Sequence, residues 1–184
     1  ICTTSGIAIP DNGCGSSELN ETFLVTTPIG TTLGADVALD EVRLNITHTW
    51  DSDLQVFLSS PLGTEIELTT GNGGAGDNYG SGASCAGTYT AFRMDAATAI
   101  AGLGAGSAPF QGNFIPEGSF AAFDTENPNG LWTIRICDGF GGDVGALHYL
   151  ELVFINPGCL APTLDPVDDI TASTATINWT APVI

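Results

Sequence analysis

The chain reads Ile46-Thr47-His48-Thr49-Trp50-Asp51-Ser52-Asp53-Leu54 and, four residues later, Ser59-Ser60-Pro61-Leu62-Gly63-Thr64. This stretch joins two segments of alternating polarity through an acidic turn. It ends in a Ser-Pro-Leu-Gly corner, in which proline fixes φ and glycine supplies a positive φ. The pattern therefore predicts strand, acidic turn, strand and a tight reversal of the chain.

Alternating apolar residues predict strands in this stretch and on both sides of it. The alternating sets are Val42, Leu44 and Ile46; Leu54, Val56 and Leu58; Trp132, Ile134 and Ile136; and Leu150, Leu152 and Phe154. A period of two places each set on one face of a sheet. Gly-rich connections separate the sets, and a short turn at residues 95–101 is the only helical candidate. We expect an all-β fold, a jelly-roll-like antiparallel β-sandwich.

The charge balance narrows the range of partners. The chain has 21 Asp and Glu against three Arg, no Lys, and a formal net charge of −18. Such a charge repels phosphate backbones and anionic membrane surfaces, so we expect no nucleic-acid partner. No apolar run reaches the ~18 residues of a membrane helix, so we expect no membrane insertion. Most of the carboxylates are expected to form a solvated acidic surface.

Five cysteines occur without the C-x-x-C spacing of metal sites: Cys2, Cys14, Cys85, Cys137 and Cys159. Disulfides in an oxidising compartment are the better interpretation, which predicts a secreted or cell-surface protein. We expect a Cys85–Cys137 bond, closing a long loop and adding about 4 kcal/mol in the chain-entropy model. Cys2–Cys14 is a second candidate pair, and Cys159 is either free or a competitor for Cys2 or Cys14.

Further motifs follow the opening stretch in a recognisable order. They are the lead-in Ala8-Ile9-Pro10-Asp11-Asn12, the segment Pro109-Phe110-Gln111-Gly112 ending at Pro116, the strand Asn129-Gly130-Leu131-Trp132, and Asp138 followed by Gly142-Asp143-Val144-Gly145. Over residues 8–155 the chain resembles the P-domain (P/Homo B domain) of kexin- and furin-like proprotein convertases and of secreted bacterial proteases. Two departures stand out: Phe92-Arg93-Met94-Asp95 replaces a common F-D-D, and Ser52 replaces a common glycine.

The resemblance implies a non-catalytic sandwich that follows a protease domain and aids its folding, stability or substrate choice. We therefore expect an accessory module of a secreted bacterial protein, with adjacent protease or surface-protein domains as partners. The chain itself would not be an enzyme, and the parent protein would be a serine or metallo-endopeptidase. Two alternatives stay open: a stand-alone binding module for a polysaccharide or an extracellular protein, and a structural module of a surface adhesin.

The composition changes at Asn156-Pro157-Gly158-Cys159. We place the P-domain at residues 1–156, with a lead-in at 1–18. Residues 157–184 are predicted to be a linker and the truncated start of a domain similar to fibronectin type III, with Trp179 as its buried tryptophan.

Five aspartates lie in expected turns or at strand ends and are the candidate ligands of a calcium ion: Asp51, Asp53, Asp95, Asp138 and Asp143. Turns gather at the rims of a sandwich, so residues distant in sequence can converge there. Calcium takes six to eight oxygen ligands, and carboxylates and loop carbonyls supply them. The alternative is that each aspartate caps its own turn.

No catalytic residues are predicted. The two histidines, His48 and His148, are a hundred residues apart, and neither H-E-x-x-H nor G-x-S-x-G occurs. His48 is expected to be a structural residue, hydrogen-bonded within the strand–turn corner. A sugar-binding surface would need exposed aromatic side chains, for which Trp50, Tyr79, Tyr89 and Tyr149 are the candidates.

Overall fold

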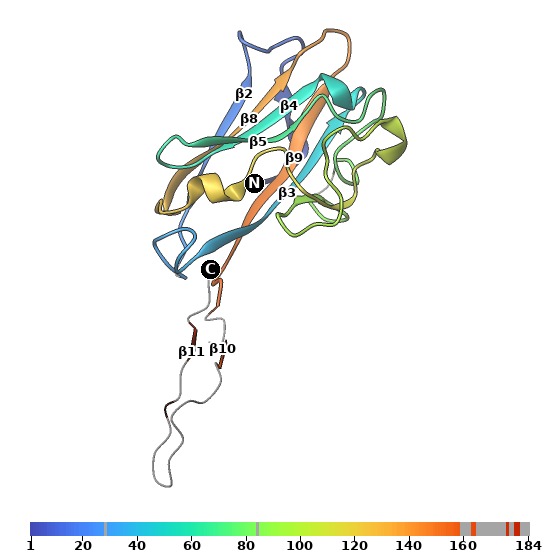
Figure 1. The fold of residues 1–184 in the computed structure, drawn as a ribbon. Coiled ribbons are helices and arrows are strands. Elements are labelled where there is room, and N and C mark those ends of the chain that lie inside the picture. Colours follow the sequence, from blue (N-terminus) through green and yellow to red (C-terminus); the bar gives the residue numbers. More distant parts are fainter. Residues whose placement is uncertain (28, 84, 159–162, 165–175, 177–178, 181–184) are drawn as a thin grey trace.

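The computed structural model describes residues 1–27, 29–83 and 85–158, together with 163–164, 176 and 179–180. Within them, two sheets form the layers of a β-sandwich (Figure 1). One sheet contains, in spatial order, β1 (Cys2–Ile9), β9 (Gly145–Ile155), β3 (Ala38–His48), β6 (Thr90–Phe92) and β7 (Gly112–Phe114). The other contains β2 (Leu19–Val25), β8 (Gly130–Asp138), β4 (Leu54–Ser59) and β5 (Glu65–Thr70). The predicted all-β sandwich is confirmed.

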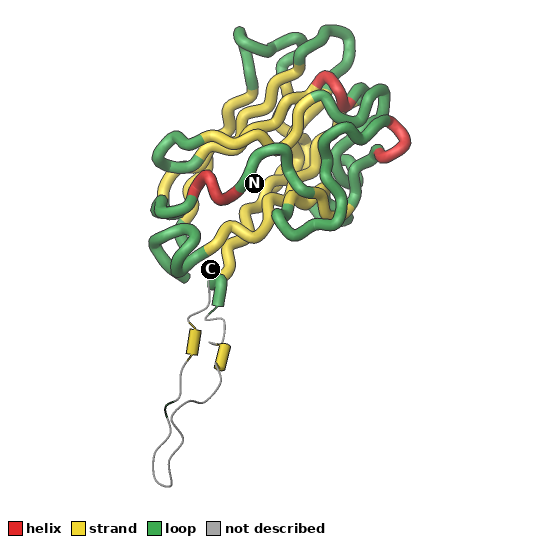
Figure 2. The backbone as a smooth tube through the Cα atoms, viewed as in Figure 1, coloured by secondary structure: helices red, strands yellow, loops and turns green. Residues whose placement is uncertain are grey.

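Pairing within the two sheets is antiparallel, with the short β6–β7 pair as a parallel exception. Three single turns of 3-10 helix interrupt the described loops: η1 (Asp51–Asp53), η2 (Ala105–Ser107) and η3 (Phe120–Phe123). Loops gather at both ends of the sandwich, and much of residues 71–111 is loop (Figure 2). These end loops position the candidate site.

The core lies between the two sheets. Val42, Leu44 and Ile46 of β3 face the apolar residues of β4 and β8, and all are buried. The predicted set on β9 is less uniform, because Leu150 is buried while Leu152 and Phe154 are only partly so. Trp132 is fully buried and donates from its indole nitrogen to the carbonyl of Pro128 at 2.7 Å. Burying a large apolar side chain contributes roughly 1.5–3 kcal/mol, so these faces supply most of the stability.

The Ser-Pro-Leu-Gly corner forms the predicted reversal between β4 and β5. Gly63 has φ +87° and donates from its backbone nitrogen to the carbonyl of Ser60 at 2.9 Å. Ser60 donates in turn to the carbonyl of Thr64 at 2.9 Å. The turn chemistry read from the sequence is therefore confirmed.

Residues 95–101 do not form the expected helical turn. Ile100 donates to the carbonyl of Ile115 at 3.0 Å, and Ile115 donates to the carbonyl of Thr98 at 2.7 Å. These backbone groups bond across to a neighbouring segment, so none remains for an internal helix turn. The apolar residues here serve the core instead, and Ile100 is fully buried.

The disulfides differ from the predicted pairing. The structure contains Cys2–Cys85 and Cys14–Cys137, so both the Cys85–Cys137 and the Cys2–Cys14 assignments were wrong. Cys85 lies beside β9, with its sulfur 3.8 Å from the carbonyl of His148, whereas Cys137 is near the end of β8 in the other sheet. The N-terminal residues, expected to be a lead-in, instead form β1 and reach both places. Cys159 lies outside the described residues.

Beyond the sandwich, β10 (Thr163–Leu164) and β11 (Trp179–Thr180) pair in a two-stranded sheet of their own. Most of residues 159–184 lies outside the described part of the chain. The predicted domain limits and the fibronectin-like start therefore stay predictions. No described helix is long and apolar enough to span a membrane.

Candidate acidic site at one end of the sandwich

The acidic turn after β3 lies against the loop that joins β8 to β9. His48 pairs with Gly145 and Leu54 pairs with Asp138, so the end of β3 and the start of β4 both border this loop. Two contacts tie the turn to the loop. The backbone nitrogen of Gly139 donates to the carbonyl of Asp53 at 2.8 Å, and the Thr49 hydroxyl donates to Oδ1 of Asp143 at 2.7 Å. The loop and the turn therefore bring Asp53, Asp138 and Asp143 to one end of the sandwich.

Asp138 is fully engaged by the protein. Its Oδ2 lies 3.2 Å from Nε2 of His48, and its Oδ1 accepts from the backbone nitrogen of Phe140 at 3.1 Å. Nδ1 of His48 lies 2.9 Å from the carbonyl of Trp50. Nδ1 of His48 thus contacts the strand–turn corner, as the sequence predicts for a structural histidine, whereas Nε2 reaches across to Asp138 at the end of β8.

Asp53 differs from Asp138 in having no partner. The residue is 9% exposed and its carboxylate has no hydrogen-bond or ion-pair partner among the described residues, but its oxygens reach solvent, unlike those of Asp51. Burial raises the pKa of Asp53 above its usual value; the charges of Asp138 and Asp143 add to the rise, and His48 opposes it. Asp53 lines an open cleft of about 440 Å³, together with Trp50, Ser52, Phe140, Gly141 and Asp143.

Asp51 lies on the same helical turn but is enclosed by the Gly-rich segment 71–80. Its backbone nitrogen donates to the carbonyl of Gly76 at 2.9 Å, and a Cβ added to Gly73 would meet Cβ of Asp51 at 2.6 Å. Both carboxylate oxygens of Asp51 are buried without a hydrogen-bond partner. Burial raises the pKa of Asp51 to about 8; the nearby backbone N–H of Asn78 opposes the rise, and the negative charge of Asp77 adds to it. Glycine at position 73 is what lets the loop close over this carboxylate.

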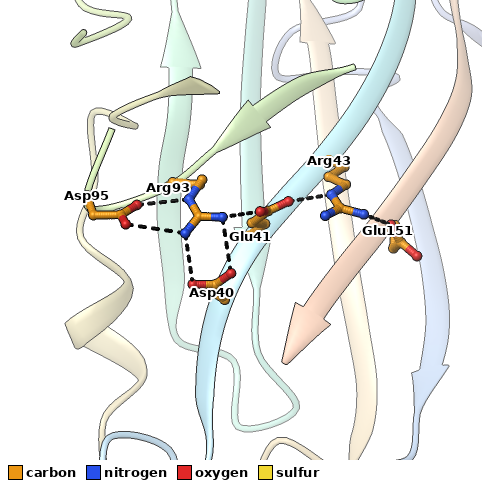
Figure 3. Close-up of polar contacts among 6 residues, drawn as sticks. All are labelled: Asp40, Glu41, Arg43, Arg93, Asp95 and Glu151. Atoms are coloured by element: carbon orange, nitrogen blue, oxygen red, sulfur yellow. Dashed lines mark hydrogen bonds and ion pairs between the residues drawn. The ribbon is translucent and has the colours of Figure 1, made fainter. Parts of the chain in front are cut away.

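Asp95 lies near the other end of β3. Arg93 binds Asp95, Asp40 and Glu41, and Glu41 also binds Arg43, which reaches Glu151 (Figure 3). We call this row of ion pairs, from Asp95 to Glu151, the ion-pair ladder. Because Asp40 precedes His48 by eight residues on β3, the Asp40 end of the ladder lies about 25 Å along the strand from the acidic turn. Asp95 is thus an ion-pair partner of Arg93, the residue that departs from the F-D-D pattern.

The five predicted calcium ligands therefore do not form one cluster. Asp53, Asp138 and Asp143 converge, Asp51 is enclosed nearby under its own loop, and Asp95 is remote. No group of three or more His, Cys, Asp or Glu side chains in the described residues is arranged to hold a metal ion. Any ion here would need backbone carbonyls and water for most of its ligands.

The four aromatic residues considered for a sugar-binding surface do not lie in one place. Tyr79 is fully buried, while Tyr89 and Tyr149 stack on each other with ring centroids 4.5 Å apart. Trp50 is exposed, and its neighbour in the cleft is Phe140, which the sequence reasoning missed. The available signal was a phenylalanine among the glycines at 139–142, where no strand could bury it.

Comparison with known proteins agrees with the motifs. The family model of the proprotein convertase P-domain matches residues 39–98, about a third of the chain, from β3 to the turn after β6, and the predicted resemblance is confirmed over this segment. The solved serine protease of Aeromonas sobria is similar at 16% identity and TM-score 0.39, and its complex with a chaperone at 15% identity and TM-score 0.40. Each match covers 85% of this chain but 22% of the solved one, so the chain spans about a fifth of those proteins. No curated protein sequence matches the chain.

Proposed function

We propose that this chain is a non-catalytic accessory P-domain of a secreted multidomain protease, which it stabilises or directs to its substrates. The observation that carries this proposal is the P-domain match over residues 39–98. The matched segment contains β3, β4, β5 and β6, together with the acidic turn and the Ser-Pro-Leu-Gly corner. It thus supplies strands to both sheets, so the match concerns the framework of the sandwich.

The state of the two histidines supports a non-catalytic role. A general base must reach a substrate proton, which requires an accessible ring nitrogen. His48 is sealed between Asp138 and the carbonyl of Trp50. His148 is also buried, and its Nε2 lies 3.0 Å from the hydroxyl of Thr47. The two disulfides support an extracytoplasmic location, because such bonds persist in oxidising compartments.

The accessory role is tested by the coding sequence on either side of the chain. We expect a peptidase domain, serine or metallo-type, in the same reading frame. Deletion of residues 1–156 from that protein should lower the melting temperature of the peptidase domain. Tandem copies of this sandwich without a peptidase would indicate an adhesin module and contradict the proposal, as would hydrolysis by the purified chain that is lost in His48→Ala.

We also propose that the domain binds calcium through Asp51. Two buried carboxylate oxygens without partners fit a bound cation, because an unpaired buried charge is otherwise costly. Asp77 is a second carboxylate close enough for its charge to raise the pKa of Asp51, and the carbonyls of the Gly-rich loop are candidate further ligands. The other predicted ligands fit less well: Asp138 is already engaged by His48 and Phe140, and Asp95 by Arg93.

Melting the protein with calcium and with a chelator tests this site. Binding to the native state alone stabilises by RT ln(1 + [L]/Kd), about 2.7 kcal/mol at a hundredfold excess over Kd. Asp51→Asn should abolish the response, and Asp95→Asn, at the remote ion-pair ladder, should retain it. An unchanged melting temperature of the wild-type protein would rule the site out.

A binding role is the second candidate function. It is favoured by one observation, the exposed pair of Trp50 and Phe140 beside two carboxylates.

A further inference from the structure

We propose that the cleft between Trp50 and Phe140 binds an arginine side chain of a partner protein, with the guanidinium held between Asp53 and Asp143. This inference does not depend on the calcium site or on attachment to a protease. It assigns a ligand class to a surface that the accessory role leaves unused.

The first argument is the unpartnered carboxylate of Asp53. It is nine-tenths buried, lines the cleft, and makes no hydrogen bond or ion pair with a described residue. Oδ1 of Asp143 accepts a hydrogen bond from the hydroxyl of Thr49, so Oδ2 is the oxygen that can bind a ligand. The oxygens of Asp53 open into the cleft without a partner, so a cation that enters the cleft can pair with them.

The second argument is that the chain has no basic side chain to spare. It contains no lysine, and its three arginines are all committed elsewhere. Arg43 and Arg93 belong to the ladder on the five-stranded sheet, and Arg135 binds Glu18 and Glu65 while stacking over Phe57 at 3.9 Å. A cation that neutralises the cleft must therefore come from outside residues 1–184, and a partner protein is the source proposed here.

The third argument is that two aromatic side chains form walls of the cleft. Trp50 is 43% exposed and Phe140 is 67% exposed, and both line the cleft. A guanidinium over an aromatic face gains a cation–π attraction, strongest with tryptophan. Its planar fork also matches two carboxylates and is more weakly hydrated than an ammonium. The cleft volume of about 440 Å³ lies within the usual range of ligand pockets.

The same walls argue against a metal ion as the occupant. Calcium takes six to eight oxygen ligands. Two of the six residues that line this cleft are aromatic, and the adjacent Asp138 has both oxygens occupied. Arginine needs fewer oxygens and uses the apolar walls for its methylene stem.

The test is a titration of the full chain with the capped peptide Ac-Gly-Arg-Gly-NH2, followed through the indole N–H resonance of Trp50 in a two-dimensional NMR spectrum. We expect saturable one-to-one binding that weakens with salt. The matched citrulline peptide keeps the shape but has no charge, and it should bind about tenfold more weakly.

Variants locate the binding. Asp53→Asn should weaken binding about tenfold, and Phe140→Ala about threefold. Phe140 is exposed, so its replacement leaves the fold intact and keeps the test valid if Asp53→Asn fails to fold. Leu62→Ala, at an exposed residue in the corner between β4 and β5, is the matched control and should bind as the wild type does.

Three results would overturn the proposal. Equal binding of the arginine and citrulline peptides would remove the charge argument. Unchanged arginine binding in both Asp53→Asn and Phe140→Ala would place the peptide elsewhere. In the Asp51→Asn variant, calcium chloride could shift the Trp50 resonance and also prevent the arginine peptide from binding. That result would assign the cleft to a metal ion.

Discussion

Nε2 of His48 lies 3.2 Å from Oδ2 of Asp138, and both side chains are wholly buried. His48 ends β3 in one sheet and Asp138 ends β8 in the other, so the contact joins the two layers at the acidic end. The carbonyl of Asp138 also accepts from the backbone nitrogen of Gly13 at 2.9 Å. One residue therefore connects both sheets with the N-terminal segment.

Removing the carboxylate of Asp138 should be strongly destabilising. Removing one partner of a buried hydrogen bond typically costs about 1–3 kcal/mol, and more where the partner is charged, because the other polar group remains buried without compensation. We expect Asp138→Ala to lower the free energy of unfolding by about that amount in urea titrations, and Asp138→Asn by less. Asp143→Asn, at a more exposed position in the same loop, is the control. A loss below about 1 kcal/mol in Asp138→Ala would contradict a structural role for the pair.

Asp51 should make stability depend on pH in calcium-free buffer. Its folded-state pKa is about 8 against an ordinary value of 3.8, so the folded protein holds this proton where the unfolded chain has lost it. Stability from this group is therefore complete below about pH 4 and falls as pH rises to about 8, by at most about 1.4 kcal/mol per pH unit.

The comparison with Asp51→Asn isolates that effect from the other carboxylates. The amide cannot ionise, so the variant should gain stability relative to the wild type as the pH is raised from 5 to 8 in urea titrations. Calcium at pH 8 should stabilise the wild type and remove the advantage of the variant. A stability difference that does not change with pH would show that Asp51 is not held protonated in the fold.

Glu41 is the centre of the ion-pair ladder and should contribute more than its neighbours. Its side chain is 11% exposed and accepts from both Arg43 and Arg93. Burial works to raise the pKa of Glu41, but the hydrogen bonds and charges of the two arginines outweigh it and lower the pKa. The stabilisation is therefore present above the unfolded pKa of about 4.5 and is lost as pH falls through the folded value.

We expect Glu41→Gln to cost about 1–2 kcal/mol at pH 7 and the difference from the wild type to shrink as the pH falls below about 4.5, measured by urea unfolding. Glu151→Gln, at the exposed end of the ladder, should cost less than about 0.5 kcal/mol. Arg43→Ala and Arg93→Ala share Glu41, so their effects should not add. Additive losses would mean that the two arginines act independently.

The sequence was most informative where local chemistry decides structure. Period-two alternation located β3, β4, β8 and β9, and the Pro61–Gly63 corner was fully determined by its turn residues. The P-domain motif at residues 46–64 is confirmed by the family match over residues 39–98, because it encodes strands and turns of the framework. In contrast, β1 was missed because Cys2–Ile9 has no clean alternation and gains its place only by pairing with β9.

The site was less predictable because it depends on direction and distance. Asp51 and Asp53 are two residues apart, yet one is enclosed by the Gly-rich loop and the other opens into the cleft. Asp95 was grouped with them because turns gather at rims, but a sandwich has two rims and Arg93 holds Asp95 near the other. Spacing along the chain carries no information about which rim a turn joins.

The disulfide pairing gives a decisive last prediction, because trypsin has few sites in this chain. Cleavage after its arginines gives peptides 1–43, 44–93, 94–135 and 136–184. With Cys159→Ser in place, the Cys2–Cys85 and Cys14–Cys137 bonds should link peptides 1–43, 44–93 and 136–184 into one species in a non-reduced digest. Adding Cys2→Ser should release 44–93 and leave 1–43 joined to 136–184. A free peptide 1–43 in the digest of Cys159→Ser would instead support the Cys85–Cys137 pairing.

Removing the Cys14–Cys137 bond by double Ser substitution should lower the free energy of unfolding by about 2–5 kcal/mol, since the bond closes a loop of 123 residues that spans both sheets.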